Sequence, residues 1–454
     1  MFHVLTDQFG SAVTLTDRAA LAHWNDLQMS FLAHGATAPD HLAKTLEADP
    51  DFALGHAVKG IFLLLLGRRE LVPTARDSLT RARETASGDM REAAFAAALD
   101  DWLAGNPAGA AERIEATMGL QSQDPLAMKC AHAIRFILGD RREMLDQLDR
   151  VLEAYDPNHS GYGYFLGCRA FALEENGRYE EARAAGIEAL AHAPDDAWGL
   201  HAVAHVYDMT GDSPGGLHWL DKNERAWSHC NNFRYHVWWH KALMHLDQGE
   251  IDAVLDLYDT KVRSDHTDDY RDIANATSLL MRLELEGTDI GDRWAELADL
   301  AERRTGDGCL IFADLHYLLA LVGDNRKAAA RRLIARIVRD GKNATTDFSR
   351  RFDAPGTAAA EGLEAFGEGA YGRAFERLVA ARTTMQRAGG SHAQRDVFER
   401  ITIDAGIRAG RLRQAGALLD ARAALRGGAE DSFSENRREM IADLGRNRVR
   451  MSAE

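Results

Sequence analysis

The stretch that decides the fold of this chain is Glu175-Asn176-Gly177-Arg178-Tyr179-Glu180-Glu181-Ala182, which closes on Ala193-Pro194. The same pattern returns as Gly369-Ala370-Tyr371-Gly372-Arg373-Ala374. A glycine at this position ends one helix without a Cβ penalty, because the backbone there adopts a left-handed conformation. Gly-x-Tyr-x-x-Ala with a distal proline is typical of a helix–turn–helix unit that repeats about every 34 residues.

Equivalent glycines recur along the whole chain. They are Gly67, Gly105, Gly139, Gly177, Gly211, Gly249, Gly287, Gly323, Gly369 and Gly410. Each follows an apolar stretch of helical period and precedes a second amphipathic stretch, whereas sustained runs of period two, typical of strands, do not occur. The repeat predicts an all-α, tetratricopeptide-like α-solenoid of about nine to ten helix pairs, coiled into a right-handed superhelix that encloses a concave cleft.

The repeat also suggests how the chain is divided. The spacing widens between Gly323 and Gly369, where Asp353-Ala354-Pro355-Gly356 is a turn signal. We expect an N-terminal cap at 1–48, a solenoid at 49–340, C-terminal helical repeats at 341–430, and a capping helix and tail at 431–454.

The charge and the apolar content of the sequence indicate which classes of partner the chain is expected to bind. The chain of 454 residues carries 54 basic and 70 acidic side chains, a net charge of −16, which argues against a nucleic-acid partner. Its longest apolar run, 61–66, is too short to span a membrane, which needs about 20 residues. The first residues do not show the pattern of a secretory signal, and the four cysteines form no C-x-x-C pair. We expect a cytoplasmic protein with no membrane partner.

Histidines gather on two consecutive helices. His201 and His205 are four residues apart and therefore share a helix face, with Asp208 one turn further along. His236 and His240 repeat the spacing on the next inner helix. Because stacked helices lie about 10 Å apart, we expect the four imidazoles and the carboxylate to converge on the concave wall.

Two interpretations of this cluster stay open. Histidines on consecutive turns can bind one metal ion, and imidazole is also a natural general acid or base, so these five residues are the candidate catalytic set. The four histidines are the candidate metal ligands, with zinc or iron as the expected ion. Haem is a weaker alternative, because no C-x-x-C-H motif is present. The second interpretation is a set of packed, hydrogen-bonded core histidines.

A second polar motif lies at Gly389-Gly390-Ser391-His392-Ala393-Gln394-Arg395-Asp396. Ser391 and Gln394 fit a capping box at a helix start, which explains them structurally. Amide protons at a helix start together with an arginine also make an anion pocket. The candidate ligand-binding residues are Gln394, Arg395 and Asp396 of this motif, together with Trp239, Asp314 and His316 from elsewhere in the chain.

These blocks together resemble the tetratricopeptide repeat protein 38 family. The resemblance covers about residues 50 to 410 and rests on the blocks at 201–206, 236–240, 257–259, 293–294, 314–316 and 389–398. It implies the helical-repeat fold and shared polar residues on the inner wall, and it implies no general reaction. This chain departs from the family pattern at Asp208, where members often carry glutamate, and at Val237 and His392, where they commonly carry asparagine.

Two functions follow from these observations. The first is a histidine-rich polar pocket that binds a small anionic ligand, held by Arg395, with metal- or histidine-dependent acid–base chemistry on that molecule if the protein is an enzyme. The alternative is a non-catalytic scaffold that binds a protein or peptide in the superhelical groove. A homodimer is compatible with both.

Overall fold

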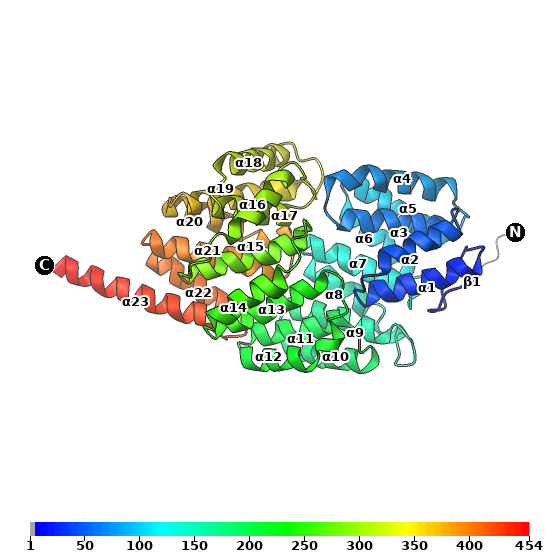
Figure 1. Cartoon of the computed structure of the whole chain (residues 1–454), viewed down its shortest axis with the longest axis horizontal. Helices are drawn as coiled ribbons and strands as arrows, with labels where there is room; N and C mark the ends of the chain where they lie inside the picture. Colours follow the sequence, from blue (N-terminus) through cyan, green and yellow to red (C-terminus); the bar gives the residue numbers. More distant parts are fainter. Residues whose placement is uncertain (1–4, 454) are drawn as a thin grey trace. The chain divides into compact units, whose positions relative to one another are not determined.

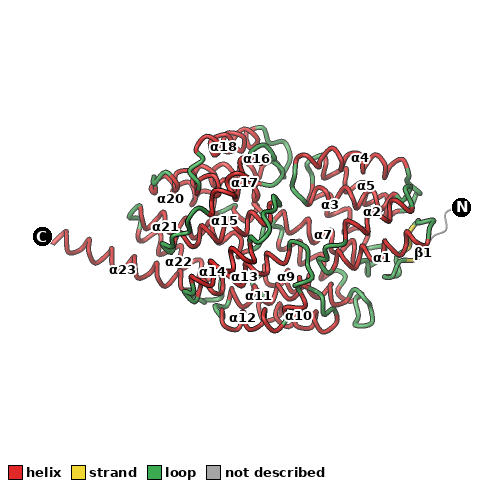
Figure 2. The backbone as a smooth tube through the Cα atoms, viewed as in Figure 1, coloured by secondary structure: helices red, strands yellow, loops and turns green. Residues whose placement is uncertain are grey.

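The computed structural model describes residues 5–453 and places 23 α-helices in that range. Figure 2 shows helices joined by short loops, with a single pair of short strands near the N-terminus. The all-α helical-repeat prediction is therefore confirmed. The structure divides into two compact units, one built from residues 1–203, 223–234 and 345–348, the other from 204–222, 235–344 and 349–454.

The first unit contains an antiparallel strand pair and the first ten helices. Its elements are β1 (Leu5–Thr6), β2 (Ala12–Val13), α1 (Arg18–Leu32), α2 (Ala38–Ala48), α3 (Ala53–Leu65), η1 (Arg69–Leu71), α4 (Val72–Glu84), α5 (Met90–Leu103), α6 (Pro107–Met118), α7 (Pro125–Leu138), α8 (Arg141–Asp149), η2 (Leu152–Ala154), α9 (Tyr162–Glu175), α10 (Tyr179–His192) and η3 (Glu224–Ala226). Helix α11 (Ala197–Met209) begins in this unit and ends in the other.

The second unit contains the remaining helices, although α13 begins in the first unit. Figure 1 labels these helices. They are α12 (Ser213–Lys222), α13 (Phe233–Asp247), α14 (Ile251–Leu257), η4 (Tyr258–Val262), α15 (Tyr270–Leu285), α16 (Arg293–Arg304), α17 (Ile311–Gly323), α18 (Lys327–Lys342), η5 (Phe352–Thr357), α19 (Ala358–Gly367), α20 (Tyr371–Arg382), η6 (Met385–Ala388), α21 (His392–Arg408), α22 (Leu412–Leu425) and α23 (Ser432–Ala453).

The ten predicted turns each lie between two consecutive helices, from α3 and α4 to α21 and α22. Nine of the ten glycines have positive φ, as the left-handed turn requires. Gly323 was predicted wrongly, because α17 continues through it and Asn325, with φ of 56°, takes the left-handed position. Gly323 has another role: a Cβ there would collide with the Trp294 ring, so the glycine lets α16 and α17 approach closely.

The ends of the chain follow the sequence in part. The predicted first helix forms as α1, and the Asp17 side chain caps it by accepting hydrogen bonds from the amides of Ala19 and Ala20. The last helix forms as α23, whereas the side chains of the predicted tail from residue 447 onward, and residues 1–4 and 454, lie outside the described residues. The predicted divisions at 48, 340 and 430 stay predictions, as do the superhelix and its cleft. No helix within 5–453 has the length and apolarity needed to cross a membrane.

Close packing between α9 and α11 depends on small residues. A Cβ at Gly167 of α9 would collide with the Asp196 carboxylate and lie 2.9 Å from the backbone nitrogen of Gly199 in α11. Asp196 is fully buried and accepts a hydrogen bond from that same amide at 3.1 Å. The two helices therefore meet backbone to backbone, and this contact fixes where α11 lies in the first unit.

Gly167→Ala should lower the free energy of unfolding by about 1–3 kcal/mol, because the added methyl group overpacks the contact between α9 and α11. Gly416→Ala in α22 is the matched control, since a Cβ there meets nothing within 4 Å. Replacing a glycine inside a helix should raise stability by up to about 1 kcal/mol. Urea unfolding monitored by circular dichroism measures both changes, and equal effects of the two substitutions would contradict the proposed close contact.

Candidate histidine site

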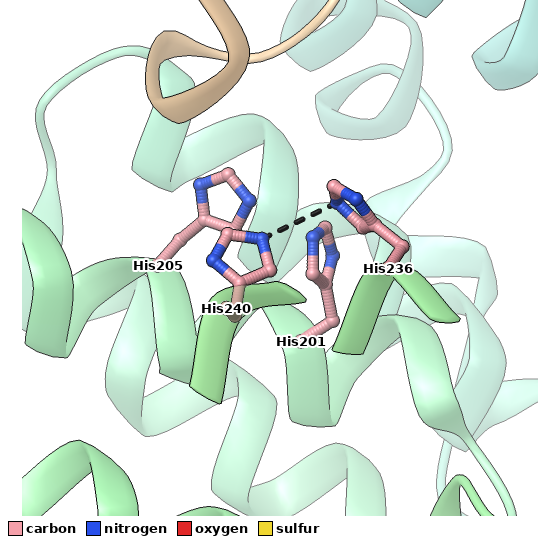
Figure 3. Close-up of side chains that lie close together, drawn as sticks. All are labelled: His201, His205, His236 and His240. Atoms are coloured by element: carbon pink, nitrogen blue, oxygen red, sulfur yellow. Dashed lines mark hydrogen bonds between the residues drawn. The ribbon is translucent and has the colours of Figure 1, made fainter. Parts of the chain in front are cut away.

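Helices α11 and α13 bring histidines on consecutive turns into one cluster (Figure 3). His205, His236 and His240 all belong to the second unit and are at most 9% exposed. The Nε2 atoms of His236 and His240 are 3.3 Å apart, and the ring centroids of His205 and His240 are 4.4 Å apart. The four-residue spacing thus places two rings of α13 against one ring of α11.

His201 lies one turn before His205 on the same helix. One ring nitrogen from each of His201, His205, His236 and His240 lies within 4.8 Å of the other three, a separation at which one metal ion can be shared. Figure 3 shows the four rings gathered around a common point. The four imidazoles converge as the sequence predicts, whereas their position on a concave wall and their role stay predictions.

Burial controls the charge of these rings. It lowers the pKa of His205 and His240 well below that of a free histidine, and neighbouring imidazoles add to the effect. Burial likewise lowers the pKa of His236 to about 4, although its hydrogen bond to Asn275 acts in the opposite direction. The three rings are therefore neutral at pH 7, the state in which imidazole binds metals.

Asn275 and Trp239 fix the orientation of His236. The Nδ1 atom of His236 lies 2.8 Å from Oδ1 of Asn275, which makes Nδ1 the donor and leaves the Nε2 lone pair directed toward His240. Trp239 stacks on the His236 ring with centroids 5.1 Å apart, and its indole nitrogen donates to Oγ of Ser278 at 3.0 Å. In a metal-binding histidine, the ring nitrogen that does not bind the metal usually donates a hydrogen bond to an amide or carbonyl oxygen.

The separation of the two Nε2 atoms suits a shared ion. Two imidazole nitrogens bound to one tetrahedral zinc ion at about 2.0–2.1 Å are about 3.3–3.4 Å apart. The observed 3.3 Å matches that value, and it is also within hydrogen-bond distance for two imidazole nitrogens (Figure 3). Without an ion, His240 must donate a proton from Nε2 to His236, because the Nδ1 proton of His236 is directed to Asn275.

Asp208, which the sequence predicts to supply a carboxylate to the cluster, contacts Arg426. Arg426 donates from Nη2 to the Asp208 backbone oxygen at 2.5 Å, and its Nη1 lies 3.6 Å from Oδ1 of Asp208. Burial raises the pKa of Asp208, and Arg426 opposes that rise. Among the described residues, the donor group within 4.8 Å contains the four histidines and not Asp208.

The Gly389–Asp396 motif has structural contacts of its own. Ser391 and Gln394 form the predicted capping box of α21. Arg395 donates from Nη1 to the backbone oxygens of Gly390 and Gly389, so its guanidinium binds its own loop rather than standing free for an anion. Arg395 nevertheless lies near the histidines, since its charge contributes to the low pKa of His205.

Asp396 belongs to an ion-pair network. It accepts hydrogen bonds from Arg400 at 2.6 Å and from Arg422 at 2.7 and 3.0 Å. These arginines hold the pKa of Asp396 well below that of a free aspartate, against the effect of its burial. The carboxylate therefore joins α21 to α22, and nothing in its contacts requires a ligand.

Asp314 and His316 lie on α17 with partners of their own. Asp314 forms a buried ion pair with Arg336 at 2.5 Å. Burial raises its pKa to about 6, although Arg336 opposes the rise. His316 donates from Nδ1 to the backbone oxygen of Phe312 at 2.8 Å, and burial lowers its pKa to about 4.

Sequence reasoning missed the polar face of α15. Asn275, Ser278 and Arg282 are spaced three and four residues apart in an otherwise buried helix, and each is 1% exposed. All three contact the histidine site: Asn275 through His236, and Ser278 and Arg282 through Trp239. The signal was available in the sequence as a polar stripe at helical spacing within a helix that precedes a turn glycine.

The titration of His316 should destabilise the metal-free protein as the pH falls from 6.5 to about 4. Unfolded histidines take up protons near pH 6.5, whereas buried His316 stays neutral down to about pH 4, so stability is full above this window and is lost within it. In urea unfolding between pH 7.5 and 5, His316→Asn should lose about 2 kcal/mol less than the unmodified chain. His218→Gln, at an exposed position, should lose as much as the unmodified chain. Identical pH dependence of His316→Asn and the unmodified chain would contradict this assignment.

No family model matches the chain. One similar solved structure is the human IFIT1 dimer with m7Gppp-AAAA, with 14% identity, TM-score 0.42 and coverage of 92% of this chain and 94% of that chain. A second is yeast Tom70, with 12% identity, TM-score 0.31 and coverage of 95% and 88%. A third is Naa15/Naa10 bound to HypK-THB, with 13% identity, TM-score 0.25 and coverage of 90% and 62%.

These identities and scores are too low to carry a function to this chain. The prediction against a nucleic-acid partner, which came from net charge alone, has no support from the comparisons and stays a prediction. The cytoplasmic location also stays a prediction. The chain is a tetratricopeptide-like helical-repeat protein by its helix–turn–helix units, while its resemblance to the tetratricopeptide repeat protein 38 family stays a prediction.

Proposed function

We propose that this protein is a helical-repeat binding protein whose histidine cluster holds a transition-metal ion that takes part in binding a small ligand. The observation that carries the proposal is the 3.3 Å approach of the His236 and His240 Nε2 atoms, with His205 packed against His240. Burial keeps these rings neutral, and Asn275 fixes the tautomer of His236 that directs a lone pair into the cluster.

Imidazole donors favour zinc, iron, copper or nickel over magnesium or calcium, which prefer oxygen ligands. Zinc fits because its preferred tetrahedral geometry needs the nitrogen separation found here. Iron(II) is the second candidate. Three histidines from the second unit suffice for an open site, in which the remaining position is left for a ligand oxygen or water.

The helical-repeat fold favours a second candidate function. Repeat proteins bind peptides and other proteins on the surfaces formed by their stacked helices, and such a scaffold needs no metal. In that case the four histidines are core residues, packed with Trp239 and Asn275. The two functions differ in one measurable property, which is metal affinity that depends on the histidines.

We expect the purified chain to bind one zinc or cobalt ion, and His240→Ala to reduce this affinity at least tenfold, because it removes one of the donors. Equilibrium dialysis with elemental analysis measures zinc binding, and the visible spectrum of the cobalt form reports tetrahedral nitrogen ligation. Asn275→Ala should weaken binding by about 10- to 100-fold through loss of the contact that orients His236.

His245→Ala is the matched control. His245 lies on the same helix but is directed to Glu250, with its Nδ1 atom 2.5 Å from that carboxylate. It should bind metal as the unmodified chain does. Circular dichroism should give the same helical content for all variants. Unchanged metal affinity in His240→Ala, or no binding by the unmodified chain, would favour the scaffold.

A further inference from the structure

Arg282 is a buried cation for which the fold supplies no carboxylate at hydrogen-bond distance. It is 1% exposed and donates from Nη1 to the Ser278 backbone oxygen at 3.0 Å and from Nη2 to the Ala393 backbone oxygen at 2.7 Å. Asp396 is its nearest carboxylate, at 4.0 Å. The Nε atom of Arg282 has no hydrogen-bond partner among the described residues. A charge buried in this way is strongly disfavoured unless a counter-ion is present.

The neighbouring carboxylates are engaged by other arginines. Asp396 and Asp431 both accept hydrogen bonds from Arg400 and Arg422, at 2.6 to 3.0 Å. A third pair joins Asp208 to Arg426. Arg282 is therefore not matched by a carboxylate of its own. Burial and the charge of Arg400 lower the pKa of Arg282 to about 9, which still leaves it charged at pH 7.

Two further polar atoms of the same region have no partner among the described residues. They are Nδ2 of Asn275 and Nε2 of His316, both on side chains that are 1% exposed. Asn275 uses Oδ1 for His236, so its amide group can donate. His316 uses its Nδ1 proton for Phe312, so its Nε2 atom can accept. Orphaned buried donors and acceptors of this kind are rare in native proteins and call for a partner.

Arg282 links these atoms to the histidine site. Its guanidinium lies 5.5 Å from the centroid of Trp239, the ring that stacks on His236. Its charge also acts on both His240 and His316, lowering the pKa of each. Arg282 is thus the common neighbour of the cluster on α13 and of His316 on α17, whose Nε2 atom has no partner among the described residues.

We propose that Arg282 binds the carboxylate of a small organic acid beside the histidine cluster, with Asn275 as a second donor and His316 as acceptor for a hydroxyl or amino group on the same molecule. The location beside a metal rests on the proposed function, whereas the anion site itself does not. A monoanion matches the single charge of the guanidinium. A phosphate dianion would bring a second negative charge close to Asp396, which lies 4.0 Å from Arg282. The proposal gives Arg282 an anion-binding role, while the same role for Arg395 stays a prediction.

The test measures thermal stability and calorimetric binding of the full chain with acetate, 2-hydroxypropanoate, inorganic phosphate and chloride, in metal-free and zinc-loaded forms. We expect both carboxylates to bind, the hydroxy acid more tightly, and phosphate and chloride to bind at least tenfold more weakly. Arg282→Gln should weaken carboxylate binding at least tenfold and Arg282→Lys less. Arg331→Gln, at an exposed position of α18, should have no effect.

Equal carboxylate binding by Arg282→Gln and the unmodified chain would overturn the proposal, as would a preference for phosphate. If Arg282→Gln does not fold, Arg282→Lys and Asn275→Ala carry the test, and unchanged carboxylate affinity in both would overturn the proposal. Carboxylate binding without zinc binding would refute the metal centre and keep the anion site. Zinc binding without carboxylate binding would refute the anion site and keep the metal centre.

Discussion

The site depends on one constraint, which is the burial of several imidazoles at a point where they must remain uncharged. Removal from water lowers the pKa of His205, His236 and His240, and His236 also disfavours a proton on the other two rings. Neutral rings at short range can either share protons or share an ion. The same burial that makes the histidines compatible with a helical core therefore also prepares them to bind a metal.

The fold could be predicted from the sequence because its signals are local. At nearly every turn the residue after the apolar helix has left-handed backbone and is a glycine, so the turns can be found in the sequence. The spacing of these glycines then gives the order of the helices. Gly323 shows the limit of this reasoning. Its identity reflects packing against Trp294, a contact between helices, whereas Asn325 supplies the turn.

The histidine pairs were visible for the same reason, since a spacing of four residues places side chains on one face. One partner of the polar motifs was visible, since Arg400 lies four residues after Asp396 on the same helix. Other partners were not visible, because they come from distant parts of the chain. Asp208 pairs with Arg426 and Asp396 with Arg422, and neither pair is encoded in a spacing. Reasoning that assigns Asp396 to a ligand from its local motif cannot detect an arginine 26 residues away. The polar stripe of α15 could have been found, but only by asking why an inner helix carries an asparagine and an arginine on its buried face.

The most direct test of the account is X-ray absorption spectroscopy of the zinc-loaded chain. The account predicts at least three imidazole nitrogens at about 2.0–2.1 Å from the metal, with the outer-ring scattering that imidazoles give. In the His236→Ala, His240→Ala double variant, two of these scatterers should be lost. A spectrum dominated by oxygen ligands, or one unchanged in the double variant, would contradict the claim that α11 and α13 direct their histidines at one shared ion.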